Sequence, residues 1–241
     1  MFDEHEFYIT TGEFVDQADW LSDYTYRHIY YRSIQKRAVD YLTTYDYLWR
    51  WDTDWFWCSK HFFVQHQFVR WLWGRDRLCS TVYWKLRNKF NRLPIAQWVA
   101  RALTGRQEAV IQDVEIPLEH APAFARFFNC EIGIKPVWVC PVEVYDRSAS
   151  FPLYPMKPGT LYINFGFWDV VSTDHEEGYF NRKIEAMVRD LQGNKSLYSN
   201  SFYSREEFWQ LYNEPAYRVL KARYDPRGKL KDLYEKCVLT K

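Results

Sequence analysis

The stretch Ala109–Pro117, AVIQDVEIP, decides the fold, because it is typical of a β-strand that ends at a proline. A short helix, AFARFF at residues 123–128, follows it. Two further strands come next, KPVWVCPVEVY at 135–145 and TLYINFGFW at 160–168, separated by the Pro-rich loop FPLYPMKPG. This succession predicts an α+β fold, built on an antiparallel or mixed sheet that is flanked by helices.

Helices are predicted after these strands. Residues 176–192 should form a helix for which Gly193 is the expected C-terminal cap. In SREEFWQLY, Ser204 and Glu207 form a capping box that opens the next helix, and Pro215 starts another. The turn YDPRG then precedes a last helix.

In the N-terminal part of the chain, before residue 105, the sequence predicts strands first and helices later. Apolar and polar residues alternate over residues 7–14 and again over 39–52, which predicts a strand in each place. From 59 to 104 the apolar residues recur at helical spacing. They form two stripes, and Pro94 separates the second of them from a predicted helix over 95–103.

An aromatic ladder marks the second of these strands: the stretch YDYLWRWDTDWFWC, residues 45–58, holds seven aromatic residues. Four of them alternate and would share one face of the strand: Tyr45, Tyr47, Trp49 and Trp51. Core packing is one interpretation. A second is a ligand pocket in which Arg50, with carboxylates within reach, orients a substrate or a cofactor edge. A surface ion-pair cluster is the third.

Composition limits the classes of function. The chain has 241 residues, of which 47% are apolar, enough for a sizeable core in one large domain or two small ones. It has no apolar run long enough to cross a membrane, and its N-terminus lacks the order of a signal peptide. Five widely spaced cysteines predict neither disulfides nor zinc, and fit a reducing, cytoplasmic setting.

Sequence motifs for common chemistries are missing. The nine glycines never form GxGxxG or GxxxxGK[ST], so no phosphate-binding loop is predicted. HExxH and GxSxG are absent, and the six histidines are scattered. No metal site is therefore predicted.

Charge is uneven along the chain. Residues 59–107 carry ten Lys or Arg and one acid, whereas the rest carries an excess of eight acids. Helices packed on the sheet with solvated basic faces are one interpretation. A membrane interface that meets anionic lipid is another. Nucleic acid is disfavoured, because the aromatic residues follow a helical stripe and not an open stacking platform.

Three stretches carry a resemblance to a known family: IKPVWVCPVEVY at 134–145, LYINFGFW at 161–168, and LYSNSFYSREEFWQLYNEPAYRVLKARYDP at 197–226. In this order and spacing they resemble the C-terminal half of the FAD-dependent delta(24)-sterol reductases and similar FAD-binding oxidoreductases. The ladder falls where that family has a Tyr/His/Arg-rich strand and a Phe-Trp pair. The residue type is kept at Tyr47, Arg50, Phe56 and Trp57, whereas Trp49 and Trp51 stand in place of His.

The resemblance implies a flavoprotein of the vanillyl-alcohol-oxidase type, in which the sheet of a cap domain roofs the isoalloxazine ring. In the relatives the nucleotide-binding half lies upstream of the position of Met1. The chain is thus expected to be a cap or substrate domain over 1–192, with a basic aromatic helical insertion at 59–107. Residues 193–241 would pack on a flavin-binding domain. That half would have to be supplied in cis or in trans.

The resemblance also implies roles for single residues. Trp138, Cys140 and Asn164 would face the flavin or the substrate, and Lys195 would stabilise reduced flavin at its edge, although the sterol reductases have no Lys there. Tyr47 and Tyr198 would be proton donors, and Arg50 would position one of them or lower its pKa. Substrate contacts would come from Trp49, Trp51 and Trp57.

The expected function is that of an FAD-dependent oxidoreductase. Flavin reduced by NADPH or NADH would deliver hydride to an alkene of a sterol or another lipid-like substrate, and a protein acid would protonate the other carbon. The basic helices would rest on a membrane surface as a peripheral contact. Two alternatives stay open: a flavin oxidase part that acts on an alcohol or sugar, and a non-catalytic aromatic-lined module that binds a lipid or a partner chain.

Overall fold

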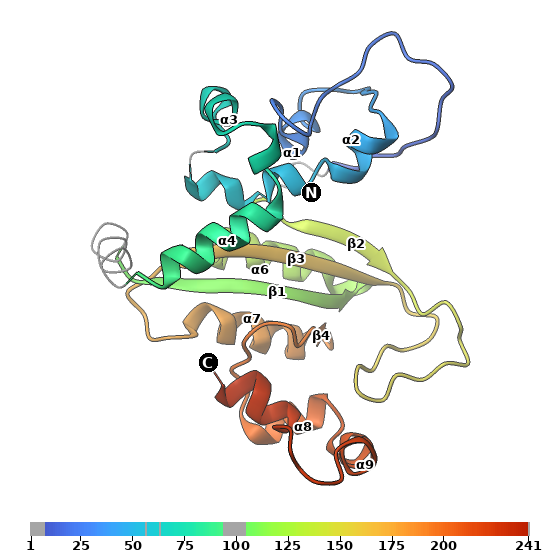
Figure 1. The fold of residues 1–241 in the computed structure, drawn as a ribbon. Helices are drawn as coiled ribbons and strands as arrows, with labels where there is room; N and C mark the ends of the chain where they lie inside the picture. Colours follow the sequence, from blue (N-terminus) through green and yellow to red (C-terminus); the bar gives the residue numbers. More distant parts are fainter. Residues whose placement is uncertain (1–7, 56, 63, 94–104, 241) are drawn as a thin grey trace. The chain divides into compact units, whose positions relative to one another are not determined.

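The computed structural model describes residues 8–55, 57–62, 64–93 and 105–240. It divides into two compact units (Figure 1). We call the unit Phe7–Gly105 the helical unit and the unit that contains Arg106–Lys241 the sheet unit. The boundary lies at residue 105, so residues 193–241 share a unit with 106–192. The functional division at residue 192 stays a prediction.

The sheet unit contains a four-stranded antiparallel sheet in the order β2-β3-β1-β4 (Figure 1). Its strands are β1 (Gln107–Pro117), β2 (Trp138–Val142), β3 (Tyr162–Ser172) and β4 (Asn194–Lys195). Its helices are η4 (Leu118–His120), α6 (Ala121–Glu131), α7 (Tyr179–Asp190), α8 (Arg205–Leu211), α9 (Glu214–Tyr224) and the π-helical turn η5 (Glu235–Leu239). The predicted α+β class with an antiparallel sheet and flanking helices is confirmed.

One face of the sheet is the core of this unit. Alternate residues of β1, among them Val110, Val114 and Ile116, are buried against α6 and α7. Aromatic rings fill the layer: the Phe128 and Phe167 ring centroids are 4.4 Å apart. Burying large side chains of this kind contributes roughly 1.5–3 kcal/mol each, so this face holds the sheet and the two helices together.

The helices after the sheet follow their sequence signals closely. The capping box between Ser204 and Glu207 is present at the start of α8, and Pro215 lies in the first turn of α9. Gly193, however, is not the left-handed cap of α7, because Gln192 has that conformation with φ 56°. A Cβ on Gly193 would lie 2.7 Å from the carbonyl oxygen of Glu115. The glycine is needed for close approach to β1, and its prediction as the cap is wrong.

The helical unit contains short helices: α1 (Tyr30–Ser33), α2 (Thr44–Trp49), η1 (Asp52–Asp54), η2 (Cys58–Phe62), α3 (Gln67–Trp73), η3 (Arg75–Arg77) and α4 (Ser80–Asn91). The strand predicted over 39–52 is wrong. Thr43 caps α2 by accepting a hydrogen bond from the backbone N–H of Asp46 at 3.0 Å, which starts a helix within the ladder.

The strand predicted over 7–14 is also wrong for its described part, residues 8–14, which has no regular structure. No strand among the described residues pairs with it, and Phe14 is 93% exposed. The predicted helical segment after residue 59 is confirmed as far as Asn91, although it consists of several short helices. The predicted helix over 95–103 lies outside the described residues.

Candidate functional site on the polar face of the sheet

The second face of the sheet, opposite α6 and α7, carries polar and aromatic side chains, and we call it the polar face. Residues opposite each other in an antiparallel pair point to the same side. One row across the sheet holds Trp138, Gly166 and Asp113. The next row holds Cys140, Asn164, Glu115 and Asn194. The structure thus brings the predicted residues Trp138, Cys140 and Asn164 together on one face.

Tyr198 joins this face from the segment after β4. Its hydroxyl accepts a hydrogen bond from Trp168 Nε1 at 2.9 Å and lies near the carboxyl group of Asp113. Burial and the neighbouring Asp113 raise the pKa of Tyr198, so its hydroxyl keeps its proton at neutral pH. The side chain is still 54% exposed.

Lys195 lies on the opposite face. It pairs with Val114 in the sheet, and its side chain points into the core side of the unit. Its Nζ donates to Glu185 Oε1 at 2.8 Å, to the carbonyl of Asn200 and to Ser201 Oγ, and the side chain is fully buried. The structure therefore does not bring Lys195 together with Trp138, Cys140 and Asn164.

Two acids that were not predicted from the sequence, Glu115 and Asp113, lie on the polar face. Glu115 accepts hydrogen bonds from Asn164 Nδ2 at 2.7 Å and from the hydroxyl of Tyr154. Burial raises the pKa of Glu115 to about 7, and the charge of Asp113 adds to this effect. Burial also raises the pKa of Asp113. Their alternation within the strand QDVEIP is the sequence signal that could have predicted two acids on one face of this strand.

Gly166 makes room for these groups. A Cβ at this position would lie 2.4 Å from Asp113 Oδ1 and 2.7 Å from the Trp168 ring. Trp168, two residues along the same strand, covers the glycine, an arrangement that compensates for the missing side chain.

We expect Gly166→Ala to destabilise the sheet unit by roughly 1–3 kcal/mol, because the added methyl group must displace Asp113 or Trp168. Chemical denaturation followed by hydrogen exchange of β1 amides measures this loss. Gly12→Ala is the matched control, since nothing lies within 4 Å of its added Cβ. Equal stability of the two variants would contradict the prediction.

The other predicted residues lie in the helical unit. The Arg50 guanidinium carbon is 3.8 Å from the Tyr47 ring centroid and 4.9 Å from that of Tyr30. The Trp51 ring contacts both Tyr30 and Trp57 edge to face. Trp57 is buried, and Trp49 is half exposed and lies beside Tyr45. The contacts found for Arg50 are therefore aromatic rings and the Tyr47 carbonyl, and not the predicted carboxylates.

Asp54, one of those carboxylates, belongs to a separate buried cluster. It accepts from Ser59 Oγ at 2.6 Å and from Gln65 Nε2 at 3.2 Å. Burial raises the pKa of Asp54 to about 6, and the hydrogen bond from Ser59 and the charge of Arg70 oppose the rise. Arg70 is itself buried and donates to the carbonyl of Thr53 at 3.0 Å. This cluster stabilises the helical unit from within.

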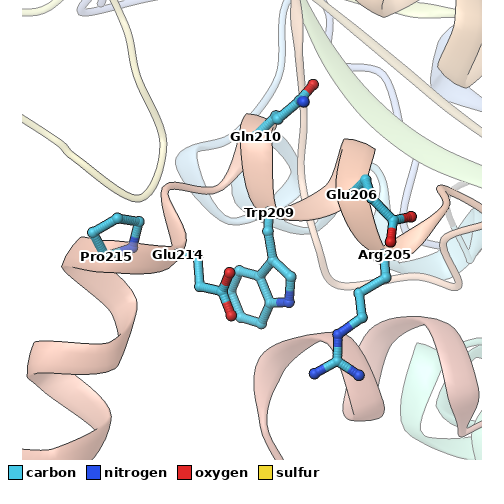
Figure 2. Close-up of a pocket in the computed structure, with 6 residues that line it drawn as sticks. All are labelled: Arg205, Glu206, Trp209, Gln210, Glu214 and Pro215. Atoms are coloured by element: carbon cyan, nitrogen blue, oxygen red, sulfur yellow. The ribbon is translucent and has the colours of Figure 1, made fainter.

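A surface hollow of ≈ 360 Å³ lies on α8 and α9 (Figure 2). Its lining residues are Arg205, Glu206, Trp209, Gln210, Glu214 and Pro215. None of the predicted site residues lines it. Figure 2 shows the Trp209 ring between Glu214 and Arg205.

Comparisons with known proteins support the resemblance found in the sequence. No protein-family model matches the chain, and no solved structure gives a significant match. Curated relatives are named delta(24)-sterol reductases. The chain is similar to these proteins, as its residues predict, and this resemblance is confirmed.

The human delta(24)-sterol reductase is 24% identical over 155 residues, which cover 64% of this chain. The Caenorhabditis elegans homolog is 26% identical over 144 residues and covers 57% of the chain, and the Arabidopsis thaliana enzyme is 21% identical over 145 residues and covers 53%. The matched region spans 30% of the human protein and 26% of each of the other two.

Proposed function

We propose that this chain is the substrate-side portion of an FAD-dependent oxidoreductase of the delta(24)-sterol reductase type. The polar face of the sheet would roof the isoalloxazine ring, and a flavin-binding half would be supplied in cis or in trans. The observation that supports this most strongly is the meeting of Trp138, Cys140 and Asn164 on one face beside titratable Tyr198 and Glu115. The similarity to the sterol reductases points the same way.

The residues on this face fit a flavin ring but not a whole dinucleotide. Flat aromatic and amide groups, such as Trp138 and Asn164, suit a flat heteroaromatic ring with polar edges. Asp113 Oδ1 is buried and has no hydrogen-bond partner, so it could accept a bond from a ligand N–H or O–H. The glycine pattern offers no phosphate-binding loop. The adenine and phosphate parts would bind to the other half.

The chemistry follows from these groups. Next to these residues, bound FAD that has been reduced by NADPH or NADH would supply the hydride for one carbon of an alkene in a sterol or another lipid-like substrate. Tyr198 would protonate the second carbon, since its hydroxyl keeps its proton and its side chain is half exposed. Trp138 excludes water from the reacting atoms, and Asn164 orients the ring or the substrate.

The helical unit would supply substrate contacts. Tyr47 and Trp49 are half exposed and would offer apolar rings for a lipid-like molecule, and Trp51 and the buried Trp57 would support them from within the unit. Arg50 offers a charge that is held among aromatic rings. Tyr47 is half exposed and stays our second candidate proton donor.

We also propose that the helical unit makes a peripheral contact with a membrane surface. Phe68, Trp71 and Leu72 are exposed on α3, at positions that share one helix face. They lie within the basic segment 59–107, so anionic lipid would attract the charges that surround them. Along the described ranges of the chain, we find no helix long and apolar enough to cross a bilayer.

The test is co-expression with a flavin-binding half from a delta(24)-sterol reductase. We expect a flavin absorption peak that survives desalting only when both parts are present and is bleached by NADPH or NADH. Trp138→Ala should weaken flavin retention about tenfold, because it removes an aromatic contact worth about 1.4 kcal/mol. Trp84→Ala, an exposed tryptophan of α4, is the matched control. Loss of flavin on desalting with both parts present would contradict the proposal. The same result would favour the alternative, a non-catalytic lipid- or partner-binding module.

A further inference from the structure

Asp113 and Glu115 form a carboxyl pair on β1. They stand at alternate positions of β1 on the polar face, which places them roughly 7 Å apart. The titratable and polar groups around them are Tyr154, Ser196 and Tyr198, with Asn164 from β3. Tyr212 also lies near enough to feel the charge of Glu115. In the described part of the chain, no Lys, Arg or His forms an ion pair or hydrogen bond with either acid.

The surroundings of the pair disfavour two negative charges. Glu115 is only 9% exposed, and Asp113 Oδ1 is buried and has no hydrogen-bond partner. Burial and a like charge both favour the protonated form of a carboxyl group. Neighbouring carboxyl groups of this kind lose their protons in two separate steps that belong to the pair.

The pair is connected to the accessible edge of the polar face. Tyr198 lies near Asp113, and its hydroxyl accepts a hydrogen bond from Trp168 Nε1 at 2.9 Å. Glu115 is held at the far end by Asn164 and Tyr154. The two acids affect each other through their charges, and Asp113 is the acid beside the half-exposed Tyr198.

We propose that Asp113 and Glu115 hold one proton between them at neutral pH and return it to Tyr198 after Tyr198 has protonated the substrate. This inference rests on the proposed function. In the first step the Tyr198 O–H bond breaks and a C–H bond forms, while the hydride from reduced flavin supplies the electron pair for the other C–H bond. In the second step a carboxyl O–H bond breaks and the Tyr198 O–H bond forms again. The doubly negative pair then takes one proton from solvent.

The pair can be tested in the chain alone, by carbon NMR of labelled carboxyl groups between pH 3 and 9. We expect one carboxyl to titrate near pH 7 and to be missing in Glu115→Gln. Asp113→Asn should move that titration to lower pH, because it removes a neighbouring negative charge. Asp146→Asn, at an exposed loop acid, is the control and should leave it unchanged. Titration of Glu115 near its ordinary value of about 4.3, or no response to Asp113→Asn, would overturn the inference.

A second measurement tests the return of the proton. With the flavin-binding half present, Asp113→Asn should lower the rate of alkene reduction per bound flavin roughly 10²-fold. Its pH profile should also lose the step near neutral pH that wild type shows. A wild-type rate and profile in Asp113→Asn would overturn the relay. If wild type retains no flavin, the proposed function fails, whereas the NMR titration still decides whether the pair shares a proton.

Discussion

Lys195→Met is expected to destabilise the sheet unit by about 3–5 kcal/mol, the range for removing one partner of a buried ion pair. Lys195 Nζ and Glu185 Oε1 are 2.8 Å apart and both side chains are buried. Glu185 also accepts the backbone N–H of Phe202, at 3.0 Å to Oε2. The substitution would leave a buried carboxylate without its cation, and would release the link between β4, α7 and residues 200–202.

Hydrogen exchange of the β1 amides in increasing denaturant measures this loss, because these amides report on the sheet unit by itself. The matched control is Lys183→Met on α7. Lys183 pairs with Glu131 at 2.5 Å, but both partners are largely solvated, so the expected loss is much smaller than for Lys195. A similar loss in the two variants would show that burial of the Lys195 pair does not matter.

Asp54 should make the stability of the helical unit depend on pH, with a change of about 3 kcal/mol. Its pKa is raised from 3.8 to about 6 in the folded chain. The folded state therefore binds the proton more tightly than the unfolded state between these values. The free energy of unfolding is highest below about pH 4, falls as pH rises to about 6, and stays low above it.

Asp54→Asn should flatten this dependence, because the side chain no longer titrates. Tryptophan fluorescence during urea unfolding at pH 4, 5, 6 and 7 measures it, since nine of the twelve tryptophans lie within residues 7–105. Asp76→Asn, at an exposed acid of the same unit, is the control. The prediction concerns the slope with pH, which Asp54→Asn can change even if it also weakens the unit through Arg70. Parallel curves for wild type and Asp54→Asn would refute it.

Most elements of the sheet unit could be predicted because their signals are local. The alternation in AVIQDVEIP, the capping box at Ser204 and Glu207, and Pro215 each depend on a few neighbouring residues. The aromatic ladder led to the wrong prediction of a strand over 39–52, because alternation of bulky residues does not exclude a helix. The Thr43 cap, with Asp46 three residues on, was the signal that favours one.

The site could be predicted only in part. The resemblance pointed to Trp138, Cys140 and Asn164, which do share a face. The pKa of Glu115, by contrast, depends on its burial in the folded chain and on Asn164, which is 49 residues away in the sequence. No local pattern encodes such a contact. The same holds for Lys195, whose direction is set by its pairing with Val114.

The two outer strands of the sheet affect how a companion polypeptide can join it. β2 pairs only with β3 among the described strands. It contains Pro141, which has no backbone N–H that could donate a hydrogen bond to an added strand. At the other border, β4 is two residues long. Neither border is a good template for an added strand. Assembly with a second chain would therefore rely on complementary side-chain surfaces, and its strength should respond to single substitutions on those surfaces more than to backbone pairing.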